Sequence, residues 1–177
     1  MNICVFGAAS DRLVDDYFLL AEELGRAMGR RGHTLIFGGG ATGLMGATAR
    51  GLLAEGGRFI GIAPRFFDVP GILMENGGEM IFTETMAERK TLMRDMSDAF
   101  ITLPGGIGTF EEFLETLTLK QLGRHEKPMA LLETLGYYQP METMLAHTAS
   151  AGFMASACLE MYRTFDNAED CLYYIET

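Results

Sequence analysis

Short apolar runs alternate along this sequence with longer segments whose apolar residues recur every three or four positions. The runs lie at 2–7, 33–40, 58–63, 79–83, 99–103 and 127–133, and the helical segments between and after them at 15–31, 43–55, 86–97, 109–122 and 138–151. Each run is continuously apolar, which indicates a strand buried on both faces. The order predicts an α/β fold: a Rossmann-like, doubly wound parallel sheet with helices on both faces. A short strand within 161–165 and a terminal helix should complete it.

The length, net charge and cysteine content of the chain exclude several classes of protein. The 177 residues show no linker or repeat, so we expect one nucleotide-binding domain spanning 1–177. Lys and Arg number 14 against 24 Asp and Glu, a net charge of −10, which disfavours nucleic acid and anionic membranes as partners. No apolar stretch approaches the ~18 residues of a membrane helix. Cys4, Cys158 and Cys171 lack the spacing of metal ligands, so we expect no metal site, reduced thiols and a cytoplasmic protein.

A first glycine-rich loop follows the second strand. Gly38-x-Gly40-x-x-Gly43 has the spacing of a dinucleotide fingerprint. That fingerprint also requires an acidic residue about twenty positions further on, but the third strand ends in IAPRF. A tight turn with close packing is therefore favoured over an NAD site.

A second glycine-rich loop, PGGIGT, follows the fifth strand and precedes a helix. Glycine lets a backbone approach a ligand closely, and the free amides at a helix N-terminus favour an anion. The residues concerned are Gly105, Gly106, Ile107, Gly108 and Thr109. Neither loop carries the Lys-Ser/Thr of a nucleoside-triphosphate P-loop, so a single phosphate held by backbone amides is the better interpretation.

Glu112 has two interpretations. Thr109-x-x-Glu112 is the pattern of a capping box, in which the acid serves only the start of the helix. The apolar arc of that helix lies opposite Glu112, so the acid should stand in the first turn, outside the core and close to the expected phosphate.

Arg89 falls in the middle of the apolar arc of helix 86–97, which a second capping box, Thr85-x-x-Glu88, should begin. A buried charge needs an acidic partner, a route to solvent or a ligand cavity. Lys90 lies at the edge of the same arc. The methionines around Arg89, Met86 among them, would suit a flat aromatic base, although such stripes are usually core.

Together these residues resemble a known family. PGGIGTFEE matches the motif PGGxGTxxE, ERK the paired Arg-Lys motif and GGGATGLMG the segment GGGxxGLMG of the LOG (Lonely Guy) family. Its members are cytokinin riboside 5′-monophosphate phosphoribohydrolases, many long labelled "possible lysine decarboxylase". The resemblance extends from ICVFGAAS through QLGRHEKPMALLE to GYYQPM.

The resemblance implies a homodimer that hydrolyses the N-glycosidic bond of AMP or its N6-modified relatives without a metal or organic cofactor. By position, Arg89 and Glu112 correspond to the catalytic pair. The substrate-binding positions it implies, together with those proposed above, are Gly40, Met86, Lys90, Gly105 to Thr109, and Thr118. Asp68, Glu75 and Glu79 are candidates for an acid that contacts the ligand in many members.

Two rival functions remain. Molybdenum-cofactor carrier proteins have a similar fold and loop but cleave nothing, and the combination of Arg89 with Glu112 favours the enzyme over the carrier. A lysine decarboxylase would need pyridoxal phosphate and a Schiff-base lysine, for which this chain has little room.

Overall fold

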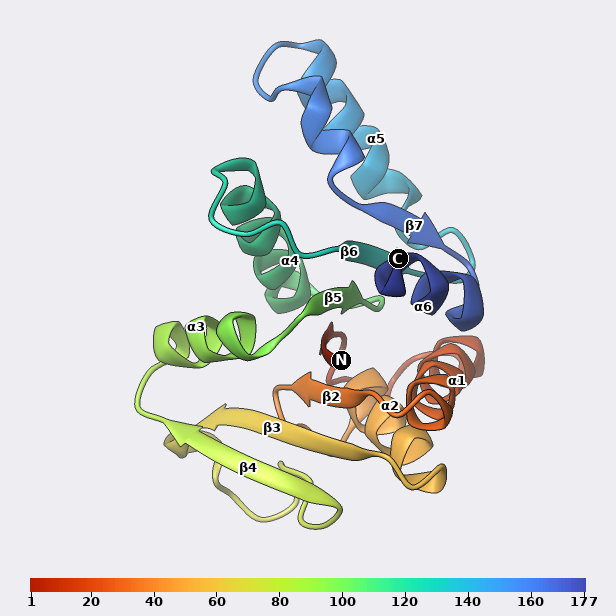
Figure 1. The fold of residues 1–177 in the computed structure, drawn as a ribbon, viewed down its shortest axis with the longest axis vertical. Helices are drawn as coiled ribbons and strands as arrows, with labels where there is room; N and C mark the ends of the chain where they lie inside the picture. The colour runs from red at the N-terminus through yellow and green to blue at the C-terminus, as the bar shows by residue number, and fades with distance from the viewer.

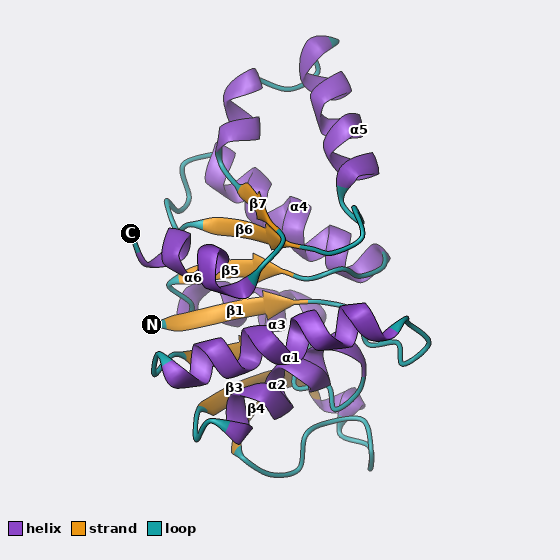
Figure 2. Cartoon of the chain, turned by 90° about the vertical axis from the view of Figure 1, so that its right-hand side faces the viewer, coloured by secondary structure: helices purple, strands orange, loops and turns teal.

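The computed structural model describes residues 1–177 and contains one seven-stranded parallel sheet. The strands are β1 (Asn2–Phe6), β2 (Thr34–Phe37), β3 (Arg58–Pro64), β4 (Gly78–Thr83), β5 (Ala99–Thr102), β6 (Met129–Leu132) and β7 (Arg163–Phe165). Their order is β4-β3-β2-β1-β5-β6-β7, and every neighbouring pair is parallel. The arrows visible in Figure 2 accordingly point the same way. The predicted α/β fold, with six main strands and a short seventh, is confirmed.

Six helices cover the sheet: α1 (Asp15–Arg30), α2 (Gly43–Ala54), α3 (Met86–Met96), α4 (Ile107–Gln121), α5 (Gln139–Ser150) and α6 (Ala168–Glu176). Two short 3₁₀ turns, η1 (Arg65–Phe67) and η2 (Ser156–Glu160), were not expected. Helices α1, α2 and α6 lie on one face of the sheet and α3 and α4 on the other, while α5 extends from the β7 end (Figure 1). No helix combines the length and hydrophobicity that a membrane span requires.

The five inner strands, β3, β2, β1, β5 and β6, are largely apolar because each one contributes to two cores. On β1, Ile3 and Val5 belong to the core under α1, α2 and α6, whereas Cys4 and Phe6 belong to the core under α3 and α4. All four residues are at most 5% exposed. This two-sided burial is what the sequence pattern predicted.

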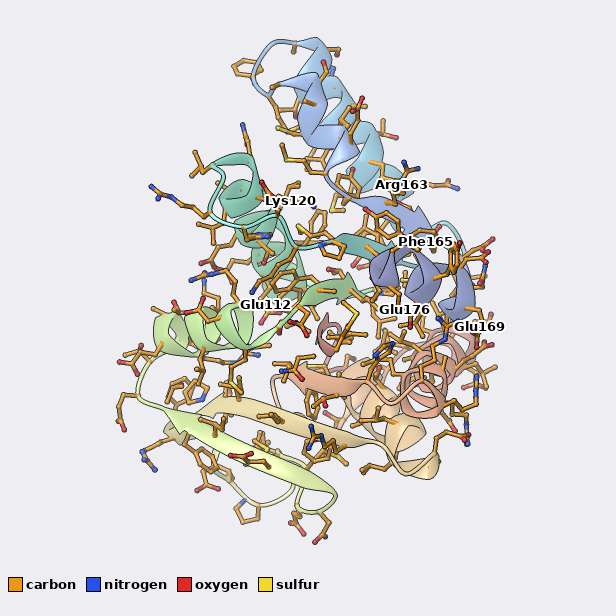
Figure 3. The ribbon with its side chains drawn as sticks, viewed as in Figure 1. Glu112, Lys120, Arg163, Phe165, Glu169 and Glu176 are labelled. Atoms are coloured by element: carbon orange, nitrogen blue, oxygen red, sulfur yellow. The ribbon has the colours of Figure 1, made fainter.

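Helix α6 closes the first of these faces. Its buried side chains join the core beside α1, and its acidic residues bind the end of α1. Arg30 Nη2 lies 3.1 Å from Glu169 Oε1, and Arg31 Nη1 lies 2.6 Å from Glu176 Oε2. Both glutamates are labelled in Figure 3.

The two predicted capping boxes have different outcomes. Thr85 is the N-cap of α3: its Oγ1 accepts a hydrogen bond from the Glu88 amide at 3.1 Å, and Glu88 Oε2 accepts one from the Glu84 amide at 2.9 Å. The prediction for Thr109 is wrong, because α4 begins at Ile107 and its N-cap is Gly106. Gly106 already has the extended backbone of an N-cap (φ −89°, ψ −156°), which places Thr109 inside the first turn.

The connection from β3 to β4 contains no α-helix. It spans 65–77 and crosses the carboxyl end of β2, where Ala41 N donates to Ile72 O at 2.9 Å and Met74 N to Gly39 O at 2.8 Å. This segment therefore lies directly against the first glycine loop, at the edge of the sheet where ligands bind in such folds.

Candidate active site

A pocket of about 580 Å³ opens at the carboxyl edge of the sheet. The chain order reverses between β1 and β5, and this switch point is where doubly wound sheets bind ligands. The pocket is lined by the loop after β1 (Gly7, Ala8, Ala9, Ser10), the loop after β2 with α2 (Gly38, Thr42, Met45), the β3–β4 connection (Phe67, Gly71, Ile72, Leu73), α3 (Met86, Arg89) and the start of α4 (Gly106, Gly108, Thr109, Glu111, Glu112). Its volume lies within the usual range for a small-molecule site.

Arg89 and Glu112 meet inside this pocket. Nη1 of Arg89 donates to Oε1 of Glu112 at 2.8 Å, and the two side chains are only 9% and 14% exposed. Nε of Arg89 donates to the Ile62 carbonyl at the end of β3, at 3.1 Å. The buried charge therefore has both an acidic partner and a pocket, two of the alternatives that its position in the apolar arc left open. Figure 3 labels Glu112 between α3 and α4.

Gly38 provides the space for the guanidinium group. A Cβ atom at this position would lie 2.4 Å from Nη2 of Arg89. A side chain at Gly38 would therefore displace the guanidinium group of Arg89, although Arg89 lies on α3, 51 residues later in the sequence.

Burial dominates the electrostatics of Glu112. Loss of solvent raises the pKa of its carboxyl group above the ordinary value of 4.5, while the charge and the hydrogen bond of Arg89 act in the opposite direction. A carboxylate with a raised pKa beside a fixed cation is typical of a functional site.

The second glycine loop presents free amides to the same pocket. The N–H groups of Gly106, Ile107, Gly108 and Thr109 donate no hydrogen bond within the protein, because they precede the first bonded turn of α4. A Cβ atom at Gly106 or Gly108 would meet no protein atom within 4 Å, and neither glycine has a positive φ. The fold itself does not need glycine at these two positions, so close approach of a ligand explains them better.

Two amides at the N-terminus of α2, after the first glycine loop, are already occupied. Gly43 N donates to Asp11 Oδ1 and Leu44 N to the Ala8 carbonyl, both at 2.8 Å. A carboxylate therefore occupies the N-terminus of α2 where a dinucleotide pyrophosphate would bind. This contact supports the interpretation of the loop as a tight turn.

Part of the pocket lining, which we call the apolar wall, is hydrophobic. It comprises Met45 from α2, Phe67, Ile72 and Leu73 from the β3–β4 connection, and Met86 from the first turn of α3. Such a surface suits a planar aromatic group.

Lys90 does not line the pocket. Its Nζ binds Glu111 and lies 2.5 Å from Oε2 of Glu115. It lines instead a water-sized space behind Glu112, of about 10 Å³.

Four other predicted binding residues do not line the pocket. Gly105 is buried beneath the loop, Gly40 pairs with Leu73, and the Ile107 side chain is 88% exposed. Thr118 is exposed about two turns further along α4 than Glu111, and its hydroxyl donates to the Leu114 carbonyl at 2.7 Å.

The three acids considered for ligand contact also lie outside the pocket. Asp68, Glu75 and Glu79 are all exposed, and the β3–β4 connection contributes glycine and apolar residues to the lining instead. No group of three or more His, Cys, Asp or Glu side chains is arranged to hold a metal ion.

Three parts of the site were not predicted from the sequence. They are the loop Gly7–Ser10 after β1, the role of Gly38, and the apolar residues of the β3–β4 connection. The strand order would have indicated the first, because β1 borders the switch point, but that order is not visible in the sequence.

Comparison with known proteins identifies the family. The model of a family described as "Possible lysine decarboxylase" matches residues 45–175, which include Arg89, Glu112 and the second glycine loop. Relatives named cytokinin riboside 5′-monophosphate phosphoribohydrolase match most of the chain. The chain belongs to the LOG family.

Three LOG relatives illustrate the similarity. The proteins of that name from Rhodococcoides fascians and Mycobacterium tuberculosis are 40% and 37% identical, over 88% and 97% of this chain and 79% and 91% of their own. LOG2 of Arabidopsis thaliana is 37% identical over 99% of this chain and 82% of its own.

Solved structures extend the likeness of fold beyond the LOG family. The molybdenum cofactor binding protein of Rippkaea orientalis has a TM-score of 0.75 at 22% identity, covering 99% of this chain and 94% of its own. DNA processing protein A of Helicobacter pylori has a TM-score of 0.62 at 16% identity, covering 99% and 80%. At such identities the likeness establishes the fold alone.

Proposed function

We propose that this protein hydrolyses the N-glycosidic bond of AMP or an N6-modified adenosine 5′-monophosphate, releasing the free base and ribose 5-phosphate. The observation that carries the proposal is the buried Arg89–Glu112 pair, which lines the same pocket as residues with free amides and as the apolar wall. The names of the LOG relatives support the same reaction.

The 5′-phosphate binds the loop at the start of α4. The amides from Gly106 to Thr109 and the positive end of the helix dipole attract the anion. Gly106 and Gly108 let it approach the backbone closely. This local site compensates for the net charge of −10, which would otherwise repel an anionic substrate.

The ribose lies over the carboxylate of Glu112. As the bond between C1′ and the base nitrogen breaks, its electron pair leaves with the base, and the sugar develops the positive charge of an oxocarbenium ion. The ionised Glu112 stabilises that charge and orients the attacking water, whose oxygen forms the new bond to C1′. Arg89 holds Glu112 in this orientation. One proton of the water stays on the new hydroxyl group at C1′. The second is released, and the departing base gains one proton, so the overall reaction adds one water across the broken bond.

The base lies against the apolar wall. Met45, Phe67, Ile72, Leu73 and Met86 supply the hydrophobic part of the pocket lining, which suits a planar aromatic base. This arrangement separates recognition of the base from binding of the phosphate.

The direct test is to incubate the pure protein with AMP and with an N6-isopentenyl AMP and to follow free base and ribose 5-phosphate by chromatography. We expect release by the wild type and a loss of at least about a hundredfold in Glu112→Gln and Arg89→Ala, since each removes a group that acts on the transition state. Turnover of Glu112→Gln within threefold of wild type would contradict the mechanism. Tight nucleotide binding without release of base would instead favour a carrier.

Two wider properties belong to the same proposal. The chain acts as a homodimer, which the large apolar side chains left exposed on α4 and beside α5 support: Leu122 is 64% exposed and Phe153 87%. It resides in the cytoplasm, where its three free, buried cysteines remain reduced. Its substrate is a small molecule, and nucleic acid is not a partner.

A further inference from the structure

The peptide that joins Gly105 to Gly106 is held from behind by a tyrosine. The hydroxyl of Tyr137 donates to the Gly105 carbonyl at 2.5 Å. Gly105 is buried, whereas Gly106 lines the pocket, and Tyr137 does not. In a trans peptide the carbonyl and the following N–H point in opposite directions, and the chain contains no cis peptide. Fixing the Gly105 carbonyl on Tyr137 therefore turns the Gly106 N–H away from the tyrosine, toward the pocket.

Neighbouring carbonyls of the loop are also held. The Leu103 carbonyl accepts from the hydroxyl of the fully buried Tyr138 at 2.7 Å, and the Pro104 carbonyl accepts from Ala8 N at 3.0 Å. The Gly106 carbonyl accepts from Phe110 N at 3.0 Å. Every carbonyl from Leu103 to Gly106 thus has a partner, while the amides of Gly106 and the next three residues have none.

The Tyr137 ring is itself fixed by aromatic contacts. It packs edge to face against Tyr17 of α1, with ring centroids 5.9 Å apart, and against Tyr138, at 5.1 Å. Burial raises the pKa of the Tyr137 hydroxyl, so this group stays protonated and can donate.

The turn before Tyr137 carries backbone strain. Leu135 is the only non-glycine residue of the chain with a positive φ (58°), and Gly136 follows with φ 68°. The Leu135 side chain is 64% exposed, so core packing does not account for the strain. Such outliers persist where the surrounding structure requires a particular chain direction. Here that direction brings the Tyr137 hydroxyl to the Gly105 carbonyl.

We propose that Tyr137 is a positioning residue for phosphate: by holding the Gly105 carbonyl it keeps the Gly106 amide aimed at the 5′-phosphate before the substrate arrives. The inference rests on the proposed function only for the identity of the substrate, because any ligand with a terminal phosphate would bind the same amide. A donor that is already oriented binds the phosphate more tightly, because little conformational entropy is lost when the ligand binds.

The test is Tyr137→Phe, which keeps the ring and removes only the hydroxyl. We expect KM for AMP to rise about five- to tenfold with kcat within about twofold, since the lost contact serves the phosphate in ground state and transition state alike. The inhibition constant of inorganic phosphate should rise by the same factor, and that of free adenine should not change. Tyr173→Phe, at a 68% exposed position on α6, is the matched control.

A purely structural role would give a different result. A partly unfolded Tyr137→Phe protein would show a lower apparent kcat and melting temperature with KM and phosphate inhibition unchanged, and that result would overturn the proposal.

Calorimetric titration with AMP and with inorganic phosphate separates the role of Tyr137 from the proposed hydrolase function. If wild-type protein binds both but releases no adenine, the proposed function fails while the role of Tyr137 is still measured from the two dissociation constants.

Discussion

At the scale of single residues, the site depends on two charges that the fold keeps away from water. Burial raises the pKa of Glu112 in the folded protein above its value in the unfolded chain. The protonated carboxyl group therefore favours the folded state at a pH below the unfolded-state pKa, and this contribution to stability is lost as the pH rises through the folded-state pKa. At neutral pH the ionised carboxylate therefore costs folding free energy, which Arg89 partly offsets. A group retained at such a cost is better explained by catalysis than by stability.

The pH dependence of catalysis follows from the same shift. If the ionised Glu112 acts on the sugar, kcat/KM falls as pH falls through the pKa of Glu112 in the free enzyme, so the acid limb lies above the ordinary value of 4.5. Arg89→Ala should move that limb still higher, because Arg89 lowers the pKa of Glu112. The measurement is the kcat/KM profile from about pH 4 to about pH 9, with a ¹³C titration of the Glu112 carboxyl in the free enzyme. An acid limb at or below 4.5 would show that another group limits the rate.

Replacement of Gly108 separates binding from folding. Gly108→Ala should raise the free energy of unfolding by about 0.5–1 kcal/mol, because alanine favours the helix and its Cβ meets no protein atom. The same Cβ would enter the space of the proposed phosphate, so KM for AMP should rise at least about tenfold, which corresponds to a loss of about 1.4 kcal/mol of binding free energy.

Gly123→Ala is the control with the opposite expectation, a loss of stability without a loss of binding. Gly123 lies outside the pocket and has a φ of +65°, which alanine adopts only with strain. It should lower stability by about 1 kcal/mol or more and leave KM unchanged. Denaturant unfolding and steady-state kinetics on both variants give the comparison, and an unchanged KM in Gly108→Ala would place the phosphate elsewhere.

At the scale of elements, α3 depends on its cap. The Thr85 side chain binds the Glu88 amide at 3.1 Å, and α3 carries Arg89. Thr85→Ala should therefore lower the free energy of unfolding by about 1 kcal/mol, or roughly 2–4 °C in melting temperature. Thr91→Ala, at an exposed position within the same helix, should be neutral or slightly stabilising. Equal melting temperatures for the two variants would mean that the cap contributes nothing.

Elements were more predictable from the sequence than their contacts. Continuous apolar runs identified six main strands, since burial on both faces leaves a local signature. The same Thr-x-x-Glu pattern, however, occurs at Thr85, where it caps a helix, and at Thr109, where it does not. The difference arises at Gly106, whose backbone becomes the N-cap of α4. Because glycine can adopt many backbone conformations, the sequence alone does not predict where this helix begins.

The candidate site was predictable only where its chemistry is local. The free amides follow from a glycine loop before a helix, and the burial of Arg89 follows from its place in the apolar arc. Its contact with Gly38 joins β2 to α3, and the Tyr137 contact joins the start of α5 to the loop after β5. Such contacts depend on strand order, which no local pattern contains.

At the scale of the whole molecule, the proposed homodimer has a direct measurement. Light scattering after size exclusion should give twice the chain mass of 19.5 kDa. Phe153→Asp places a charge on the exposed apolar surface beside α5 and should shift the mass toward that of one chain at micromolar concentration. Leu19→Asp, at a 63% exposed position on α1, is the control and should leave the mass unchanged. A wild-type mass of 19.5 kDa at all concentrations would refute the dimer.

The segment that crosses from β3 to β4 contributes no charged group to the pocket and much of its apolar wall. The proposed catalytic pair and phosphate loop belong to α3 and α4, so exchanges within 65–77 leave those groups in place. If the base binds the apolar wall as proposed, selectivity for the leaving base can diverge among descendants of this chain while the groups at the sugar stay the same. Exchanging this one segment between relatives would then change the choice of base without touching Arg89 or Glu112.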